Sequence, residues 1–400
     1  MLTFEVAAKA ITPNPSTRIK VVGVGGAGGN TINTLLKHSP DLVEYIVINT
    51  DAQAIALSHA PQKLRIGHQA THGRGSGANP DIGRAAAEED LAAIIAMLDD
   101  ADMVFLIGGL GGGTGSGAIP VIAHALRERN ILTVCIVTKP FGFEGRRRMQ
   151  VADQSEGALA DSVDALITIP NEKLLTLHQH TASMIEAFEE VNRVIGNCVQ
   201  GIVDIILKPG HINVDFADVQ TVMKNMGTAV MGTGRASGVD RALIAATAAV
   251  ESPYLAHTSI RGARSILINV TGDHRLGLHE IHHVATQVTA HADPHATIII
   301  GSVIDETMGD DVSVTVIATG FSPRSAQEMI TSYRAEEKLT NTTHHAAPQS
   351  STNHISPDHP LRNILPSLEK RLKEQYNLPQ EELEIPTLLR KLRKEQESTK

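Results

Sequence analysis

Short apolar runs alternate with amphipathic segments along the first half of the chain. The runs are rich in β-branched residues and lie at 19–24, 45–48, 103–107, 131–137 and 165–169. Segments with helical character follow at 84–98, 118–127 and 149–160, and another begins near Asn30. Runs that are apolar throughout, separated by helices, predict a parallel sheet covered on both faces. The expected fold class is therefore α/β, with a Rossmann-like first domain.

A single long helix is predicted after this sheet. Its apolar residues recur at steps of three and four, which places them on one helical face: Met184, Phe188, Val191, Ile195, Cys198, Ile202 and Ile205. The pattern ends at Leu207, before the stop signal Lys208-Pro209-Gly210. Such a helix can connect two domains while packing on both.

The remaining pattern predicts a smaller α+β domain and a C-terminal linker. Helices are expected near 240–250 and 278–291, and strands at 265–270, 296–303 and 312–319. The last strand alternates, as expected if one face is exposed or packed differently. From residue 323 the chain is polar and cannot bury enough surface to fold alone. The expected parts are an N-terminal tail (1–17), a nucleotide domain (18–183), the central helix (184–210), a second domain (211–322), a linker (323–376) and a terminal peptide (377–400).

Composition excludes several classes of function. The formal net charge is −9, aromatic residues make up 3% and Trp is absent, which argues against nucleic-acid binding. The only cysteines, Cys135 and Cys198, lie in apolar surroundings, as expected for buried free thiols. No apolar run is long enough to span a bilayer, and the N-terminus does not have the pattern of a signal peptide.

The first candidate site is the glycine-rich motif GVGGAGGN at 23–30, between a predicted strand and a helix. Glycines let backbone N–H groups approach phosphate oxygens, and a helix N-terminus adds a favourable dipole. Gly23, Gly25 and Gly28 also satisfy G-x-G-x-x-G. This motif alone is compatible with a dinucleotide site, with another nucleotide site or with a tight turn that binds nothing.

A second motif, GGLGGGTGSG at 108–117, changes this balance. Seven glycines in ten residues cost much backbone entropy, which indicates that a bare backbone is needed there. Two strand–glycine–helix junctions in one sheet suit a triphosphate, whereas a dehydrogenase needs one. The sequence contains no G-x-x-x-x-G-K-[ST] motif, so a P-loop site is excluded.

The segment GGGTGSG at 111–117 closely resembles the signature of the tubulin/FtsZ family, with Ser116 where the FtsZ branch commonly has Thr. The resemblance covers about 300 residues, from Ile19 to Phe321, and favours the bacterial FtsZ branch over eukaryotic tubulin. Further blocks agree in order: NTDAQA (49–54), GANP (77–80), VTKPFGFEGRRRM (137–149), ITIPNEKLL (167–175) and NVDFADV (213–219).

The resemblance implies a cell-division GTPase that forms filaments, with GTP or GDP as ligand and Mg²⁺ held by the phosphates rather than by side chains. It places the phosphates on two loops, Gly25, Gly26, Ala27, Gly28, Gly29 and Asn30 in the first, and Gly112, Gly113, Thr114 and Gly115 in the second. It adds Asp51 to the GTP site, Gly77 and Ala78 near the γ-phosphate, and Glu144 and Arg148 at the ribose and phosphates. Without the resemblance, Arg146–Arg148 would be interpreted as a solvated basic face.

Guanine recognition is implied for Phe188, by stacking, and for Asn30, Asn171 and Asn192. Phe188 also belongs to the apolar stripe of the long helix, so core packing is its alternative role. The family often has an acid at or just after the position of Asn192, whereas this chain has Arg193. Either Asn192 makes the contact alone or the selectivity for guanine is weaker.

Two acids, Asp215 and Asp218, are three residues apart at a predicted helix start that runs to Met226. From spacing alone, Asp215 caps the helix and Asp218 interacts with its dipole. The resemblance instead implies that this loop enters the nucleotide site of the next subunit, where both acids orient and polarise the attacking water and Asn213 assists.

The segment His279-Glu280-Ile281-His282-His283 satisfies H-E-x-x-H, the pattern of a zinc protease. The extended motif fails, since Thr286 and Thr289 replace the expected Gly and third His. We therefore interpret the segment as a surface helix with incidental histidines.

The C-terminal sequence LEIPTLLR at 383–390 resembles the FtsZ docking peptide. Ile385, Pro386, Leu388, Leu389 and Arg390 are expected to bind membrane-tethering division proteins. The implied partners are these proteins and further copies of the chain, with no sequence-specific nucleic acid. The implied location is the cytoplasm at mid-cell, beneath the membrane.

Overall fold

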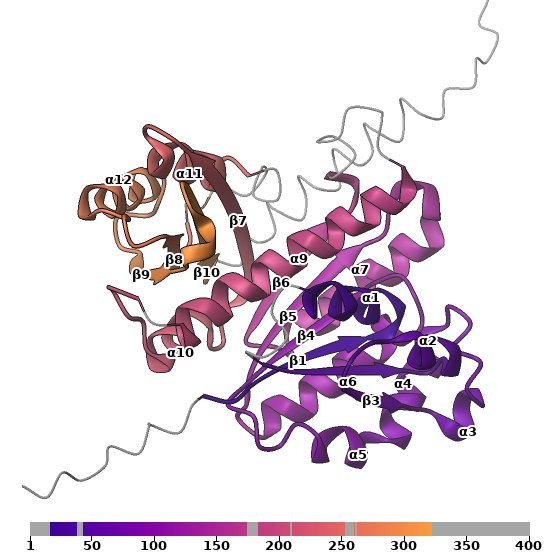
Figure 1. The fold of residues 1–400 in the computed structure, drawn as a ribbon. Helices are drawn as coiled ribbons and strands as arrows, with labels where there is room; N and C mark the ends of the chain where they lie inside the picture. Colours follow the sequence, from indigo (N-terminus) through magenta and orange to yellow (C-terminus); the bar gives the residue numbers. More distant parts are fainter. Residues whose placement is uncertain are drawn as a thin grey trace, which may run out of the picture. The chain divides into compact units, whose positions relative to one another are not determined.

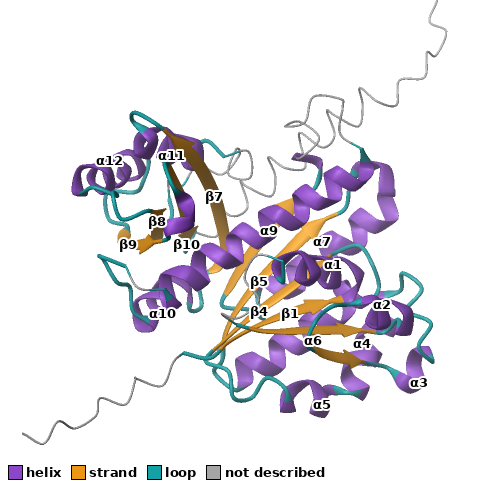
Figure 2. Cartoon of the chain, viewed as in Figure 1, coloured by secondary structure: helices purple, strands orange, loops and turns teal. Residues whose placement is uncertain are grey.

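A ten-stranded sheet runs through the described part of the chain, in the order β3-β2-β1-β4-β5-β6-β7-β10-β8-β9. The computed structural model describes residues 17–37, 43–173, 183–208, 210–252, 260 and 262–321. Neighbouring strands from β3 to β7 are parallel, β10 is antiparallel to both β7 and β8, and β8 is parallel to β9. Figure 2 shows the helices that flank these strands. The predicted α/β fold class is confirmed.

The first group of elements builds the nucleotide-domain candidate. Its elements are β1 (Ile19–Val24), α1 (Gly25–Leu35), β2 (Glu44–Asn49), α2 (Ala52–Leu57), β3 (Gln62–Arg65), α3 (His68–Thr71), α4 (Pro80–Glu89), α5 (Leu91–Ala96), β4 (Met103–Gly109), α6 (Thr114–Glu128), β5 (Leu132–Lys139), η1 (Gly142–Glu144), α7 (Arg146–Ala160) and β6 (Ala165–Pro170). Strands β1, β4 and β5 are buried along almost their whole length, as the unbroken apolar runs predict.

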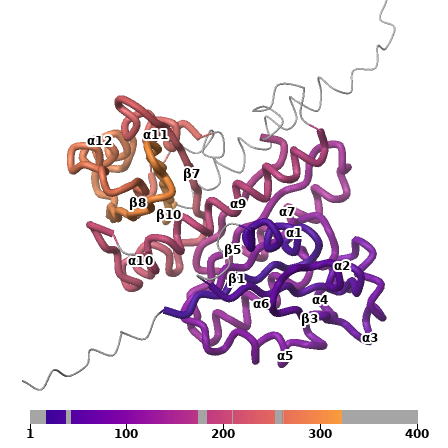
Figure 3. The backbone as a smooth tube through the Cα atoms, in the orientation of Figure 1, coloured from indigo at the N-terminus to yellow at the C-terminus, as the bar shows by residue number. Residues whose placement is uncertain are grey.

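The second group begins with the long helix. Its elements are α9 (Met184–Leu207), α10 (Phe216–Met223), β7 (Gly227–Ser237), α11 (Arg241–Val250), β8 (Ser265–Gly272), α12 (Leu278–Thr289), β9 (Thr297–Ile304), η2 (Glu306–Met308) and β10 (Asp311–Thr319). The tube in Figure 3 follows the chain from α9 through α10 into β7. The predicted division into domains remains a prediction, because β6 and β7 pair directly and the sheet is continuous.

Four predicted helix boundaries differ from those in the structure. Helices α1 and α6 begin at Gly25 and Thr114, inside the glycine motifs rather than after them. The segment expected as one helix over 84–98 is broken at Asp90, whose carboxylate accepts a hydrogen bond from Gly67 N at 2.6 Å. The helix expected to reach Met226 ends at Met223. Tertiary contacts therefore override the local pattern.

Strand β7 was not predicted because its glycines hide the apolar pattern. A Cβ on Gly234 would lie 2.7 Å from Ala249 N, so the glycine lets α11 pack closely against the strand. Strand β10 has two differently packed faces, as its alternation suggested. Val312, Val314 and Val316 pack in one core cluster, and Ile317 packs in another.

Helix α9 connects the two groups of strands, and Figure 1 shows it running between them. Its predicted limits are confirmed, and its predicted stripe is buried from Val191 to Ile205. Met184 and Phe188, at the N-terminal end, are 67% and 39% exposed, so the stripe leaves the core there. Cys198 lies on the buried stretch, and burial raises the pKa of its thiol and of that of Cys135, which confirms two buried free thiols.

Ile202→Ala should lower the free energy of unfolding by about 2–5 kcal/mol, because Ile202 is fully buried in the core beneath α9 and its loss leaves a cavity. Urea denaturation measures the change. Ile244→Ala on α11 is the matched control, since Ile244 is 51% exposed. Equal losses in the two variants would contradict the assignment of α9 to the core.

Candidate functional site

The two glycine motifs meet at one edge of the sheet. They follow β1 and β4, which are parallel neighbours, so their carboxyl ends lie side by side. A Cβ on Gly25 would lie 3.2 Å from Gly115 N, and one on Gly109 would lie 2.9 Å from the Cβ of Ala27. The two helix N-termini therefore present their unpaired N–H groups at a shared edge, as an anion site requires.

The glycines of these motifs fall into two kinds. A Cβ on Gly28 would overlap Ile107 O, one on Gly115 would overlap Gly109 O, and one on Gly113 would lie 2.8 Å from Asn79 N. By contrast, a Cβ on Gly26 or Gly112 would meet nothing within 4 Å. The first kind lets the backbone segments approach each other, and the second kind leaves a bare cradle that fits phosphate groups.

A hydroxyl network joins the second motif to the preceding loops. Thr114 Oγ1 lies 2.7 Å from Thr50 Oγ1 and 3.1 Å from Ser76 Oγ, and all three side chains are buried. Ser116 Oγ accepts a hydrogen bond from Gly111 N at 2.8 Å, so the hydroxyl that this chain keeps closes the glycine loop. The sequence pattern did not predict Thr50 and Ser76 as residues of this site. Their signal is a small polar residue that directly follows a strand or precedes a glycine turn.

The segment 76–79 lies against the second motif. Gly77 and Ala78 both have left-handed backbones, with φ values of 58° and 57°. This conformation strains Ala78 by about 1–2 kcal/mol, because its Cβ crowds the following carbonyl. Asn79 accepts a hydrogen bond from Asp81 N at 3.0 Å and caps α4. Asp51 similarly caps α2, accepting from Gln53 N at 2.8 Å.

Glu144 and Arg148 lie beside the glycine loop and form an ion pair. Glu144 Oε1 also accepts a hydrogen bond from Phe141 N at 2.9 Å, and Arg148 is half exposed. A Cβ on Gly111 would lie 2.8 Å from Arg148 O, so the arginine's backbone abuts the loop. The charge of the guanidinium is partly neutralised by Glu144.

The residues predicted to recognise the base are brought together between α1, α9 and the turn after β6. Asn192 Oδ1 accepts a hydrogen bond from Thr31 Oγ1 at 2.9 Å, which ties α9 to the helix that carries the exposed Asn30. Phe188 packs edge-on against Phe141, with ring centroids 5.5 Å apart. Its 39% exposure leaves part of the ring available for stacking.

Asn171 and Arg193 complete this region. Asn171 Oδ1 is buried and has no hydrogen-bond partner among the described residues. A buried acceptor without a partner is costly, so this atom fits a ligand that donates an N–H group. Arg193, which replaces the usual acid, is exposed and forms an ion pair with Glu190, whose carboxylate accepts from Nε at 2.9 Å.

The three predicted hydrolytic residues lie elsewhere, beyond the C-terminal end of α9. Asp215 caps α10, where its Oδ1 accepts from Asp218 N at 2.8 Å, and Asp218 Oδ2 accepts in return from Asp215 N at 3.3 Å. Asn213 Oδ1 accepts from Gly210 N at 2.9 Å. The capping role foreseen from spacing is therefore real. Among the described residues, no hydrogen bond or ion pair joins these three side chains to the glycine motifs.

The spacing along α9 explains this separation. Phe188 lies near the start of the helix, and Asp215 follows its end. At 1.5 Å per residue, the helix from 188 to 207 holds the two ends about 28 Å apart. The predicted phosphate site and the predicted acids of one chain therefore adjoin opposite ends of this helix.

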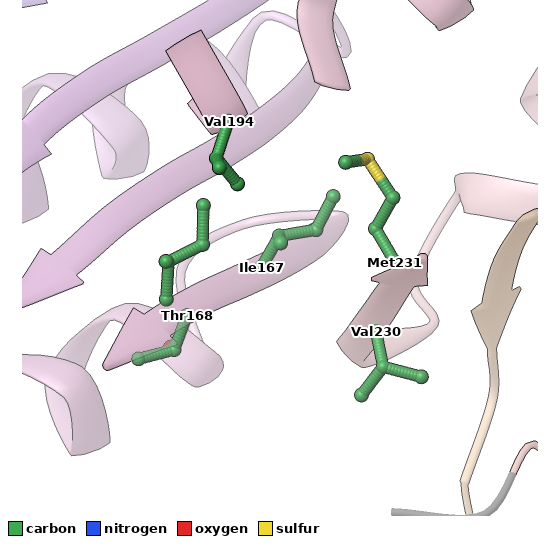
Figure 4. Close-up of a pocket in the computed structure, with 6 residues that line it drawn as sticks. Ile167, Thr168, Val194, Val230 and Met231 are labelled. Carbon is green, nitrogen blue, oxygen red and sulfur yellow. The ribbon is translucent and has the colours of Figure 1, made fainter. Parts of the chain in front are cut away.

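Other candidate features do not join the site. Glu280 of the H-E-x-x-H segment forms a bidentate ion pair with Arg241, at 2.7 and 3.2 Å, and this hydrogen bonding lowers its pKa. A small apolar pocket, drawn in Figure 4, lies between β6, α9 and β7 and has no charged lining side chain; it is lined by Ile167, Thr168, Ile169, Val194, Val230 and Met231. Ile385, Pro386, Leu388, Leu389 and Arg390 lie outside the described residues. No described helix is both long and apolar enough to cross a membrane.

Comparison with known families identifies two matching models. Residues 18–179 match the GTPase domain of the tubulin/FtsZ family, and residues 227–322 match the C-terminal domain of the FtsZ family. The chain is 52% identical to the cell division protein FtsZ of Pseudomonas aeruginosa over 306 residues, which is 76% of this chain and 78% of the relative. It is 44% identical to that of Coxiella burnetii over 386 residues, covering 95% and 98%.

Solved structures agree. An empty FtsZ dimer from M. jannaschii is 43% identical and matches with a TM-score of 0.73, over 76% of this chain and 88% of that one. GDP-bound CetZ1 from Haloferax volcanii, at 20% identity and a TM-score of 0.66, covers 80% of this chain and all of that one and shares the fold.

Gly26→Ala should fold normally but bind GTP about tenfold more weakly or worse, because its methyl group enters the bare cradle. Gly28→Ala is the matched contrast. Its methyl group overlaps Ile107 O, so it should lose about 1–3 kcal/mol of stability. Nucleotide titration and thermal unfolding separate the two effects. Unchanged GTP affinity in folded Gly26→Ala would contradict the cradle.

Proposed function

The chain belongs to the tubulin/FtsZ family of GTPases, and from that premise we propose that it hydrolyses GTP where two copies meet head to tail in a filament. It is an FtsZ-type cell division protein with a tubulin-like GTPase domain. The observation that carries the proposal is the separation of the glycine cradle from Asp215 and Asp218 by the length of α9. A heterologous contact that repeats end to end produces a filament and joins the cradle of one copy to the acids of the next.

In the proposed site, the N–H groups of the two glycine motifs bind the phosphates, and Gly77 and Ala78 contact the γ-phosphate. Phe188 stacks on guanine, while Asn30, Asn171 and Asn192 hydrogen-bond its edge. Mg²⁺ bound with the nucleotide would supply charge neutralisation on the transferred group. Glu144 and Arg148 hold the ribose and phosphates. The orphaned Asn171 Oδ1 supports a ligand that donates a hydrogen bond at this position.

The neighbouring copy supplies Asp215 and Asp218, which orient and polarise the attacking water, while Asn213 holds the turn of their loop through Gly210 N. Little covalent chemistry is required of the protein in phosphoryl transfer, so positioned carboxylates suffice. Hydrolysis then weakens the contact and drives filament turnover. The cycle predicts turnover that rises with protein concentration as filaments form.

We further propose how the protein reaches the division site. The segment 383–390 binds a membrane-tethering division protein through Ile385, Pro386, Leu388, Leu389 and Arg390. This brings the filaments beneath the membrane at mid-cell, in the cytoplasm. The family membership and the apolar peptide at the end of a polar linker support this assignment.

Light scattering and phosphate release with GTP and Mg²⁺, followed across protein concentration, test the proposal. Concentration-dependent turnover together with scattering supports it. Equal turnover per molecule in demonstrably monomeric protein would refute a site shared between copies, and binding without any turnover would indicate a non-hydrolysing relative.

Asp215→Asn and Asp218→Asn should each keep GTP binding but lose turnover by about 10²-fold or more. Asn caps helices as well as Asp does, so α10 stays intact while the carboxylate charge is removed. Phosphate release at saturating GTP measures the loss. Asp240→Asn at the N-cap of α11 is the control. Wild-type turnover in both Asp215→Asn and Asp218→Asn would leave them with the capping role alone.

A further inference from the structure

The loop at 210–215, which carries Asn213 and Asp215 and leads into Asp218 on α10, packs on strand β9. Ile212 N donates to Ser302 Oγ at 2.9 Å, and Ser302 N donates to Ile212 O at 3.0 Å. One residue of β9 thus engages both backbone groups of Ile212. Ser302 is 2% exposed, so water competes little for its hydroxyl.

The packing around this contact leaves little room for adjustment. A Cβ on Gly301 would lie 2.5 Å from Ile205 Cδ1 and 2.8 Å from Val214 Cγ2, so α9 and the loop both close on the strand at this glycine. A Cβ on Gly210 would overlap Ser302 O. Val214, which directly precedes Asp215, is itself buried.

A partly buried charge cluster fixes the entrance of the loop. Lys208 Nζ lies 3.1 Å from Asp204 Oδ2 on α9 and 3.1 Å from Asp305 Oδ2 just after β9. Asp305 is held in turn by Thr307, which donates from N at 3.0 Å and from Oγ1 at 2.6 Å. Gln200 Nε2 donates to the other oxygen of Asp204.

The electrostatics make Lys208 the essential member of this cluster. Burial raises the pKa of Asp204. Burial also opposes the charge of Lys208, but the facing carboxylates of Asp204 and Asp305 outweigh it, and the pKa of Lys208 is raised. The ammonium therefore stays charged at neutral pH. Without it, the carboxylates of Asp204 and Asp305 would face each other without a compensating charge at the exit of α9.

We propose that Lys208 and Ser302 are positioning residues for GTP hydrolysis, which fix the 210–215 loop on β9 and so set where Asp215 and Asp218 enter the neighbouring nucleotide site. This rests on the proposed role of the two acids. Lys208 fixes the loop where it leaves α9, and Ser302 fixes it midway, three residues before Asp215. Misplacement of a catalytic group by about 1 Å can cost as much as 10²-fold in rate.

Lys208→Met is the first test, because it keeps the length and apolar stem of the side chain and removes the charge. Turnover per sedimented subunit at saturating GTP should fall by about tenfold or more, while the KM for GTP stays within about twofold of wild type. Lys208→Arg should recover most of the rate, since it keeps the charge and can pair with both carboxylates. Lys37→Met, at the exposed C-terminal end of α1, is the matched control.

Ser302→Ala is the second test and decides alone if Lys208→Met does not fold or assemble. It keeps the Ser302 N to Ile212 O bond and removes the acceptor of Ile212 N, so turnover per sedimented subunit should fall while the KM for GTP stays unchanged. Normal turnover in either folded variant would overturn the proposal, as would a loss in Lys208→Met that Lys208→Arg does not recover. Asp215→Asn run in parallel separates the outcomes. If Asp215→Asn is as active as wild type, the proposed hydrolytic role of Asp215 fails. If Asp215→Asn is inactive while the Lys208 and Ser302 variants are active, only the positioning role fails.

Discussion

The rigid burial of α9 is the constraint on which the rest of the structure depends. From Val191 to Ile205 its apolar face is part of the core beneath the sheet, and its C-terminal part contacts both β8 and β9. A helix held this way cannot shorten or bend enough to bring its two ends together. The proposed nucleotide cradle therefore lies near one end of the helix and the proposed hydrolytic acids lie beyond the other. In that proposal, activity that uses both comes from more than one copy.

The proposed cradle would bind phosphate through backbone N–H groups rather than through charged side chains. Without a P-loop lysine, the proposed phosphate binding relies on two adjacent helix N-termini and on backbone segments that only glycine lets approach closely. Arg148, the basic side chain beside the loop, is already paired with Glu144. A site built from dipoles offers less net positive charge than one built from lysines. In the proposed cycle, this lower positive charge suits a protein whose contact with the neighbouring copy must weaken after hydrolysis.

The sequence predicted the parts of the fold that follow from local pattern. Strands β1 and β4 and both limits of α9 could be placed because uninterrupted apolar runs and the three–four periodicity are local signals. Strand β7 could not, since Gly234 interrupts its apolar pattern to let α11, the next helix, pack closely on the strand. The break at Asp90 depends on Gly67, twenty-three residues away. Such long-range causes leave little trace in a local pattern.

The site shows the same limit. The glycine motifs and Asp215 could be predicted as candidates because each lies in a compact sequence motif. Spacing alone assigned Asp215 to helix capping, and the family resemblance then implied a hydrolytic role for it. The buried hydroxyls of Thr50 and Ser76, and the contact of Lys208 with Asp305, join residues from separate elements, so only the folded chain brings them together.

These connections bear on how the contact between copies is released after hydrolysis. Ser76 ties the strained Ala78 turn to Thr114 inside the cradle, while Ser302 ties the acids' loop to β9. In the proposed filament, the turn that responds to the γ-phosphate and the acids that orient the attacking water are therefore each anchored to the sheet of their own copy. Loss of the phosphate can then loosen the contact between copies without loosening either fold.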